Sequence, residues 1–155
     1  PTAPRVTPGT NDHERHASDS SEQRAIELEV LHALEAILYV RFLKNLPATL
    51  GKLKLDGYAD GSPPTLVEVF AHVGRAKGGQ RYKIAHDMTK LLLAERRLGV
   101  PCRKVIAVID ETAIAHMTQG WDGAFAKEFG IEVKVVPGFD DRHEVLRKVQ
   151  ERQRR

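Results

Sequence analysis

The apolar residues of this chain repeat with two different periods, and the order of those periods restricts the fold. From Ile26 to Phe42 they recur every three or four residues, which is typical of one face of a helix. From Leu50 to Val73 they alternate with polar residues or form a short run, which is typical of strands. Helical and strand patterns then take turns to the C-terminus. The sequence therefore predicts the order α-β-β-α-β-α-β-α.

The turn-rich segment 59–65 separates the first two predicted strands and indicates an antiparallel hairpin. Later strands are joined through helices, so we expect them to be parallel. The remaining elements are expected in this order: a helix over about 80–98 that ends at Gly99 and Pro101, a buried strand over 104–110, a helix over 111–129 weakened at Gly120 and Gly123, a strand over 131–136, and a last helix that opens at Asp140 or Asp141. The predicted fold is α/β, a mixed sheet with helices on both faces.

Residues 1–20 hold three prolines and almost no large apolar side chain. Such a segment buries too little surface to offset the entropy of ordering it, so we expect a disordered leader. Ser20 or Ser21 is then expected to cap the first helix, which should run to Asn45. A single domain is predicted for residues 21–155.

The chain has one cysteine, Cys102, and no apolar run long enough to span a membrane. Nothing at the N-terminus resembles a secretion signal. These features predict a cytoplasmic protein that does not enter a membrane.

Basic side chains are concentrated in two segments, although the net charge is only +3. Residues 75–104 carry nine basic and two acidic side chains, and residues 142–155 carry six and two. A patch built from these segments could neutralise the phosphates of a nucleic acid. A solvated helix face would account for the same charges, so composition leaves both interpretations open.

Two carboxylates fall on the predicted hairpin, Asp56 in the first strand and Glu68 in the second. If the hairpin is symmetric, Tyr58 lies opposite Leu66 and the two carboxylates lie opposite each other, where they should repel. A divalent cation between them would remove that repulsion, and carboxylate oxygens suit Mg²⁺ or Mn²⁺. A slip of one residue would instead turn one carboxylate to solvent.

The segments Leu55-Asp56-Gly57-Tyr58 and Leu66-Val67-Glu68-Val69-Phe70, set between two helices and followed by a strand, are similar to the core of the PD-(D/E)xK nuclease superfamily. The resemblance covers roughly residues 22–136. It implies a restriction-endonuclease-like core in which Asp56, Glu68 and the backbone carbonyl of Val69 hold Mg²⁺ or Mn²⁺. It also implies hydrolysis of nucleic acid, and DNA is expected as the substrate in preference to RNA.

The chain departs from this pattern at Phe70, where the superfamily has a lysine two residues after the glutamate. A lysine from elsewhere would have to replace it, and we expect Lys83 first, then Lys77, then Lys54, which the assumed register places across from Phe70. Gln80 shares a helical face with Lys83, Asp87 and Lys90 and is expected to bind substrate. For each lysine taken alone, a solvated surface role is the simpler interpretation.

Three further residues have less certain roles. His72 lies on the Glu68 face and could contact substrate or metal, or simply end the strand. Glu27 or Glu35 of the first helix could add another acidic group, and the sequence does not choose between them.

Two functions follow from these residues. The first is a metal-dependent deoxyribonuclease, and the alternative is a catalytically degenerate nuclease-fold module that binds nucleic acid or a protein partner. A homodimer or a partner protein would supply the recognition surface that so short a core lacks.

Overall fold

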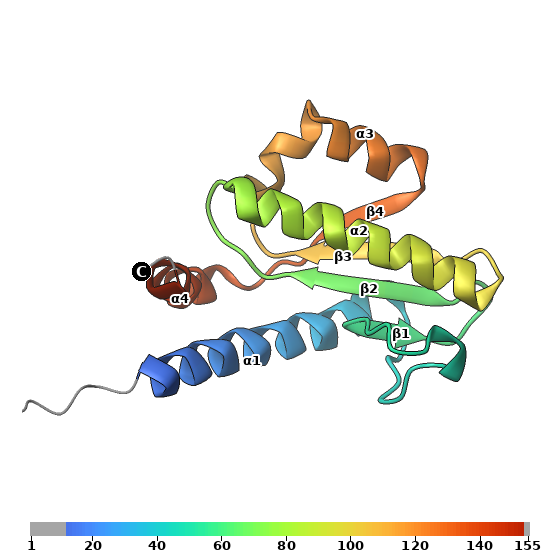
Figure 1. Ribbon diagram of the computed structural model, residues 1–155, viewed down its shortest axis with the longest axis horizontal. Helices are drawn as coiled ribbons and strands as arrows, with labels where there is room; N and C mark the ends of the chain where they lie inside the picture. The colour runs from blue at the N-terminus through green and yellow to red at the C-terminus, as the bar shows by residue number, and fades with distance from the viewer. Residues whose placement is uncertain (1–11, 154–155) are drawn as a thin grey trace, which may run out of the picture.

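Four strands form one mixed sheet in the order β1-β2-β3-β4 in the computed structural model, which describes residues 12–153 (Figure 1). The strands are β1 (Gly57–Ala59), β2 (Thr65–Phe70), β3 (Arg103–Val108) and β4 (Ile131–Val135). The first two pair antiparallel, and β2–β3 and β3–β4 pair parallel. The predicted mixed sheet and the predicted order of helices and strands are confirmed.

Helices cover both faces of the sheet. Figure 1 shows α1 (Asp12–Leu38) on one side of β2 and α2 (Gly78–Leu98) on the other. The helix α4 (His143–Gln153) lies in the layer of α1, and α3 (Trp121–Glu128) lies in the layer of α2. Within residues 12–153, no helix is both long and apolar enough to cross a lipid bilayer.

The two-residue period of β2 divides its side chains between the two layers. Val67 and Val69 pack with α1 residues such as Val30 and Leu34. Leu66 and Phe70 pack with α2 and β3 instead; the buried residues of that layer include Ile84, Met88, Leu91 and Ile106. Glu68 shares the phase of Leu66 and Phe70, so the strand turns its one carboxylate toward α2.

The first helix differs from its prediction at both ends. It begins at Asp12 rather than Ser20, because no glycine or proline interrupts residues 12–38. The leader predicted as disordered is therefore helical over 12–20, and residues 1–11 lie outside the described part. The helix ends at Leu38 because Tyr39 adopts a left-handed φ of 56°. Glu35 then accepts the backbone N–H of Phe42 at 3.0 Å and fixes the reversal.

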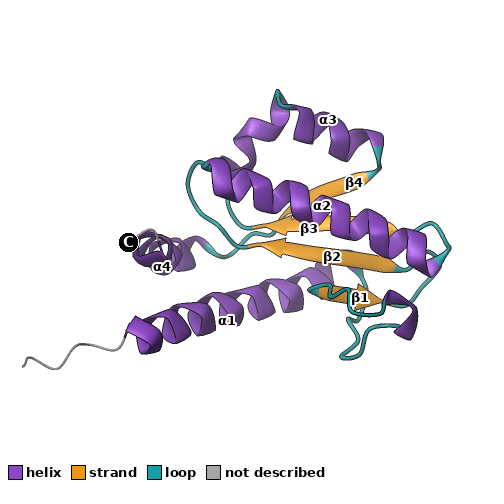
Figure 2. Cartoon of the chain, in the orientation of Figure 1, coloured by secondary structure: helices purple, strands orange, loops and turns teal. Residues whose placement is uncertain are grey.

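The first predicted strand is much shorter than expected. Residues Ala48–Leu50 form a 3₁₀ helix, η1, and residues 51–56 follow as a loop before the three residues of β1 (Figure 2). Arg97 of α2 donates to the Leu50 carbonyl at 2.8 Å and holds this segment against the helix. The predicted pairing of Lys54 with Phe70 is therefore wrong, whereas the predicted pairing of Tyr58 with Leu66 is confirmed.

The third predicted helix is divided in two. Residues Glu111–Thr118 form a 3₁₀ helix, η2, and α3 starts only after Gly120. The two pieces meet so closely that a Cβ on Gly123 would lie 1.6 Å from the Met117 carbonyl oxygen. Glycine is therefore required at position 123, inside α3, for the two pieces to pack this closely.

Candidate active site

Asp56 and Glu68 meet at the β1 edge of the sheet. Asp56 directly precedes Gly57, which pairs with Val67, and the Asp56 carboxylate is close enough to Glu68 to raise the pKa of that residue. The Asp56 Oδ2 atom accepts the backbone N–H of Val69 at 2.8 Å, which anchors this exposed carboxylate to β2. The geometry predicted for the carboxylate pair is present, although Asp56 precedes β1 instead of lying within it.

Glu68 is the most constrained acid of the site, with 2% of its surface exposed. Burial and the neighbouring Asp56 carboxylate both raise the pKa of Glu68 and Lys90 opposes the rise, so that the pKa reaches about 8. The Lys90 Nζ atom lies 2.7 Å from Glu68 Oε1. Among the described residues, however, no group donates a well-directed hydrogen bond to that oxygen. Glu68 Oε1 is thus a buried acceptor beside a cation.

A second ion pair lies one helical turn away on α2. The Lys83 Nζ atom is 2.8 Å from Asp87 Oδ2, and Asp87 is 3% exposed. Burial alone would lower the pKa of Lys83, but the carboxylates of Asp87 and Asp56 outweigh it and raise the pKa. The Lys83 ammonium also lies 5.9 Å from the centre of the Phe70 ring, so it remains a cation beside β2.

The first helix supplies a further acid, and the structure identifies it as Glu27. Burial raises the pKa of Glu27, and the charge of Asp56 raises it again, so the two side chains share one electrostatic environment. Glu35 is committed to the end of α1 through its bond to Phe42. Of the two residues that the sequence left open, Glu27 is therefore the one whose charge interacts with Asp56.

Oxygen atoms are the only ligands that this site offers a metal. The Val69 carbonyl is a third oxygen ligand beside the two carboxylates. It points to the same edge of β2 as the Val69 N–H that is bonded to Asp56. Within residues 12–153, no three His, Cys, Asp or Glu side chains are grouped to bind a metal ion by themselves. Mg²⁺ is commonly held by one or two carboxylates, with water and substrate phosphate as the other ligands, and this donor set fits that arrangement.

His72 and Gln80 lie beyond Phe70 and serve the start of α2. Their side chains approach at 3.4 Å, and Gln80 Oε1 accepts the backbone N–H of Lys77 at 3.2 Å. Burial lowers the pKa of His72 to about 4, so its imidazole is neutral at physiological pH. Both side chains are engaged with each other or with the helix end, and the structure shows no contact between either of them and the carboxylate pair.

The two remaining predicted lysines differ in position. Lys77 is exposed at the start of α2. Lys54 lines a hollow of about 560 Å³ together with Lys52 and Lys90. Because Lys90 also contacts Glu68, this cationic hollow borders the carboxylate pair. Lys54 thus lies at the rim of the site, by way of the loop before β1.

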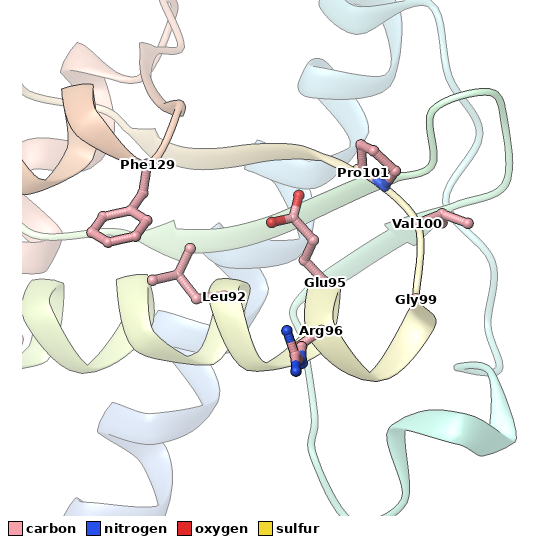
Figure 3. A pocket seen from close by; sticks show the side chains of 7 residues that line it. All are labelled: Leu92, Glu95, Arg96, Gly99, Val100, Pro101 and Phe129. Atoms are coloured by element: carbon pink, nitrogen blue, oxygen red, sulfur yellow. The ribbon is translucent and has the colours of Figure 1, made fainter.

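The hollow in Figure 3 lies at the opposite end of α2 and contains different chemistry. It is lined by Leu92, Glu95, Arg96, Gly99, Val100, Pro101 and Phe129. Its carboxylate, Glu95, already accepts the Cys102 N–H at 2.9 Å and lies 2.6 Å from the Lys104 ammonium. That acid is satisfied within the fold and leaves no reactive group in this hollow.

Lys90 and Asp87 are the site residues that sequence reasoning placed on the polar helix face without assigning them a role. The signal for them was their spacing, because residues 83, 87 and 90 lie on one side of α2.

Comparison of the chain with protein-family models, with curated proteins and with solved structures found no significant match.

Proposed function

We propose that this chain is a metal-dependent nuclease that hydrolyses phosphodiester bonds of DNA on a restriction-endonuclease-like core. The observation that carries the proposal is the meeting of Asp56 and the buried Glu68 at one sheet edge, with two lysine ammonium groups beside them. A buried carboxylate next to another carboxylate is costly in a fold that makes no use of the pair. The element order from α1 to β4 agrees with such a core.

Asp56, Glu68 and the Val69 carbonyl would hold the Mg²⁺ or Mn²⁺ ion. When bound, the ion would make a water molecule more acidic and stabilise charge on the phosphate. The ion would also give Glu68 Oε1 the directed partner that it lacks among the described residues. Binding requires the ionised carboxylate, so it would reverse the effect of burial on Glu68.

Lys83 takes the place of the lysine that Phe70 replaces. Its ammonium lies over the Phe70 ring, and the neighbouring acids keep it protonated. A cation held there can stabilise the negative charge that develops on a phosphate oxygen. Lys90 is the second cation of the site, in contact with Glu68 itself. Lys52 and Lys54 at the rim would bind the flanking phosphates.

A second candidate function is a binding module without catalysis. It is favoured by one specific contact, because the Lys90 ammonium at 2.7 Å neutralises Glu68 without any metal. In that case the cationic hollow would bind phosphates and the carboxylates would serve the fold alone. Binding of DNA that is unaffected by chelators, together with an absence of cleavage, distinguishes this function from the first.

A cleavage assay tests the proposal. Plasmid and single-stranded DNA are incubated with Mg²⁺, Mn²⁺ or EDTA, and the wild type is compared with Asp56→Asn and Glu68→Gln. We expect metal-dependent cleavage that both substitutions reduce at least a hundredfold. Glu95→Gln is the matched control, since Glu95 is an ion-paired glutamate on α2, outside the site. Equal cleavage by all four proteins would show that the activity does not come from this site.

A further inference from the structure

A second hollow lies on the other flank of α2, where the first turns of that helix approach the junction of η2 and α3. Its volume is about 370 Å³, and the residues that matter to it are Arg81, Tyr82, His116, Trp121 and Asp122. None of these residues takes part in the carboxylate site. Its composition is aromatic and polar, which is unusual for a surface hollow that merely separates two helices.

Two large aromatic rings stand exposed at this hollow. Tyr82 is 80% exposed and Trp121 is 69% exposed. The indole meets the Phe125 ring edge-on with centres 6.5 Å apart, so one side of it is supported within α3. Exposed aromatic side chains can stack on nucleobases of any sequence, because every base has a π face.

The charged groups of the hollow suit a base better than a phosphate. His116 Nε2 lies 3.1 Å from Asp122 Oδ2, and both side chains are about nine-tenths buried. The largely buried Asp122 carboxylate lines the hollow; it would repel a phosphate but can accept a hydrogen bond from the amino group of a base. Arg81 at the exposed edge supplies a cation for the adjoining backbone.

The position of the hollow relates it to the carboxylate site. Tyr82 and Lys83 are consecutive residues of α2, so the helix presents one toward the hollow and the next toward Asp87 and Phe70. A helix with its side chains is about 10–12 Å wide, which is the length of about three stacked nucleotides. One strand that crosses α2 can therefore reach both places.

We propose that this hollow binds an unpaired nucleobase of a single-stranded nucleic acid whose backbone crosses α2 to the carboxylate site. The inference rests on the proposed function and names its substrate class, since a base inside a duplex offers no free face to Tyr82 and Trp121. Single strands, or duplexes with unpaired ends, are then bound in preference to blunt duplexes.

Trp121 is the only tryptophan of the chain, so its fluorescence reports directly on stacking. The wild-type protein is titrated in EDTA with a short single-stranded oligonucleotide and with the blunt duplex of the same sequence. We expect quenching by the single strand and weaker binding of the duplex. Tyr82→Ser, measured by the same quenching, and Trp121→Ala, measured by fluorescence anisotropy of a labelled strand, should each weaken single-strand binding about fivefold or more.

Tyr39→Asn is the matched control, because Tyr39 is another tyrosine, 94% exposed, and directly follows α1. It should leave the affinity unchanged. Equal affinity for single strand and duplex, or no loss of affinity in the Tyr82→Ser variant, would overturn the inference, and so would a failure to bind any single strand. Because binding is measured without metal, the two proposals can fail separately. Quenching without cleavage would support the base-binding hollow and contradict the nuclease. Cleavage without quenching would support the nuclease and contradict the hollow.

Discussion

Replacing Glu68 by glutamine should change how the stability of the fold depends on pH. In the folded protein the pKa of Glu68 is raised to about 8, from 4.5 for an ordinary glutamate, because the side chain is buried beside Asp56. A group whose folded pKa is raised stabilises the fold fully below its unfolded pKa, and that stabilisation is lost as the pH rises through the folded pKa. The wild type should therefore lose stability between about pH 4.5 and pH 8.

The size of the effect follows from the separation of the two pKa values, which is about 3.5. At about 1.4 kcal/mol for each pKa unit, ionisation of Glu68 costs the fold up to about 5 kcal/mol. For a chain of this length that corresponds to a fall of about 10–20 °C in the melting temperature. Glutamine has the same shape and does not titrate, so the Glu68→Gln variant should avoid this loss. Lys90 then loses its partner, but it is 23% exposed and can reach water at every pH.

The assay is thermal unfolding followed by circular dichroism over about pH 5 to pH 9, in EDTA and in Mg²⁺. Since a cation binds only the ionised carboxylate, Mg²⁺ should raise the melting temperature of the wild type most above pH 8 and should not affect the variant. Parallel pH curves for wild type and Glu68→Gln would refute the reasoning, because they would show that Glu68 is not held in this environment.

Glu95→Gln is the control, because the pKa of Glu95 is shifted in the opposite direction to that of Glu68. Burial alone would raise the pKa of Glu95, but hydrogen bonds from Lys104 and from the Cys102 N–H lower it below the ordinary value. Its contribution to stability is therefore present at neutral pH and is lost as the pH falls through the folded pKa. The Glu95→Gln variant should be less stable than the wild type at pH 7, yet it should keep the wild-type response to Mg²⁺.

Three further predictions test separate parts of the structure. Lys83→Met should lower kcat for DNA cleavage about a hundredfold with little change in metal affinity, which single-turnover kinetics and calorimetry can separate. Lys90→Met leaves the Glu68 carboxylate without its cation, so urea unfolding above pH 8 should show a loss of about 3 kcal/mol that shrinks at acidic pH, where the acid is protonated. Gly123→Ala should destabilise the fold by more than about 2 kcal/mol, because its Cβ would lie 1.6 Å from the Met117 carbonyl oxygen. A Cβ at Gly79 meets nothing within 4 Å, so Gly79→Ala should stabilise the fold by up to about 1 kcal/mol. Urea unfolding compares the two variants.

The sequence predicted the parts of the fold that depend on hydrophobic period. Val30 and Leu34 are buried on the predicted helix face, and the hairpin register follows from a symmetric turn. The alternation over residues 50–56 was misread as a strand. Leu53 and Leu55 pack against the core beneath α2, and Lys52 and Lys54, which alternate with them, are exposed, but the segment has no strand partner. Alternation reports which side chains are buried, and pairing requires a neighbour that the sequence does not show.

The candidate site was predicted in part for the same reason. The period of two places Asp56 and Glu68 on the same face of the predicted hairpin. The contact of Lys90 with Glu68 depends instead on how α2 is rotated above the sheet, which the sequence does not show. One general rule would have helped. A helix that crosses between parallel strands runs back along the strand it follows, so its first turns cover the end of that strand and later turns cover earlier residues. Lys83 over Phe70 and Lys90 over Glu68 obey this order.

The surroundings of Phe70 show why a phenylalanine suits position 70 better than a lysine does. Phe70 has no exposed surface, and its ring lies between the Lys83 ammonium and the His72 ring, whose centre is 4.4 Å away. A lysine at 70 would bring a second ammonium into that space, where burial and the charge of Lys83 both oppose it. The apolar ring of Phe70 adds no charge there, so Lys83 and Lys90 remain as two cations near the carboxylates. A lysine at position 70 is therefore expected to be unfavourable while Lys83 lies beside it.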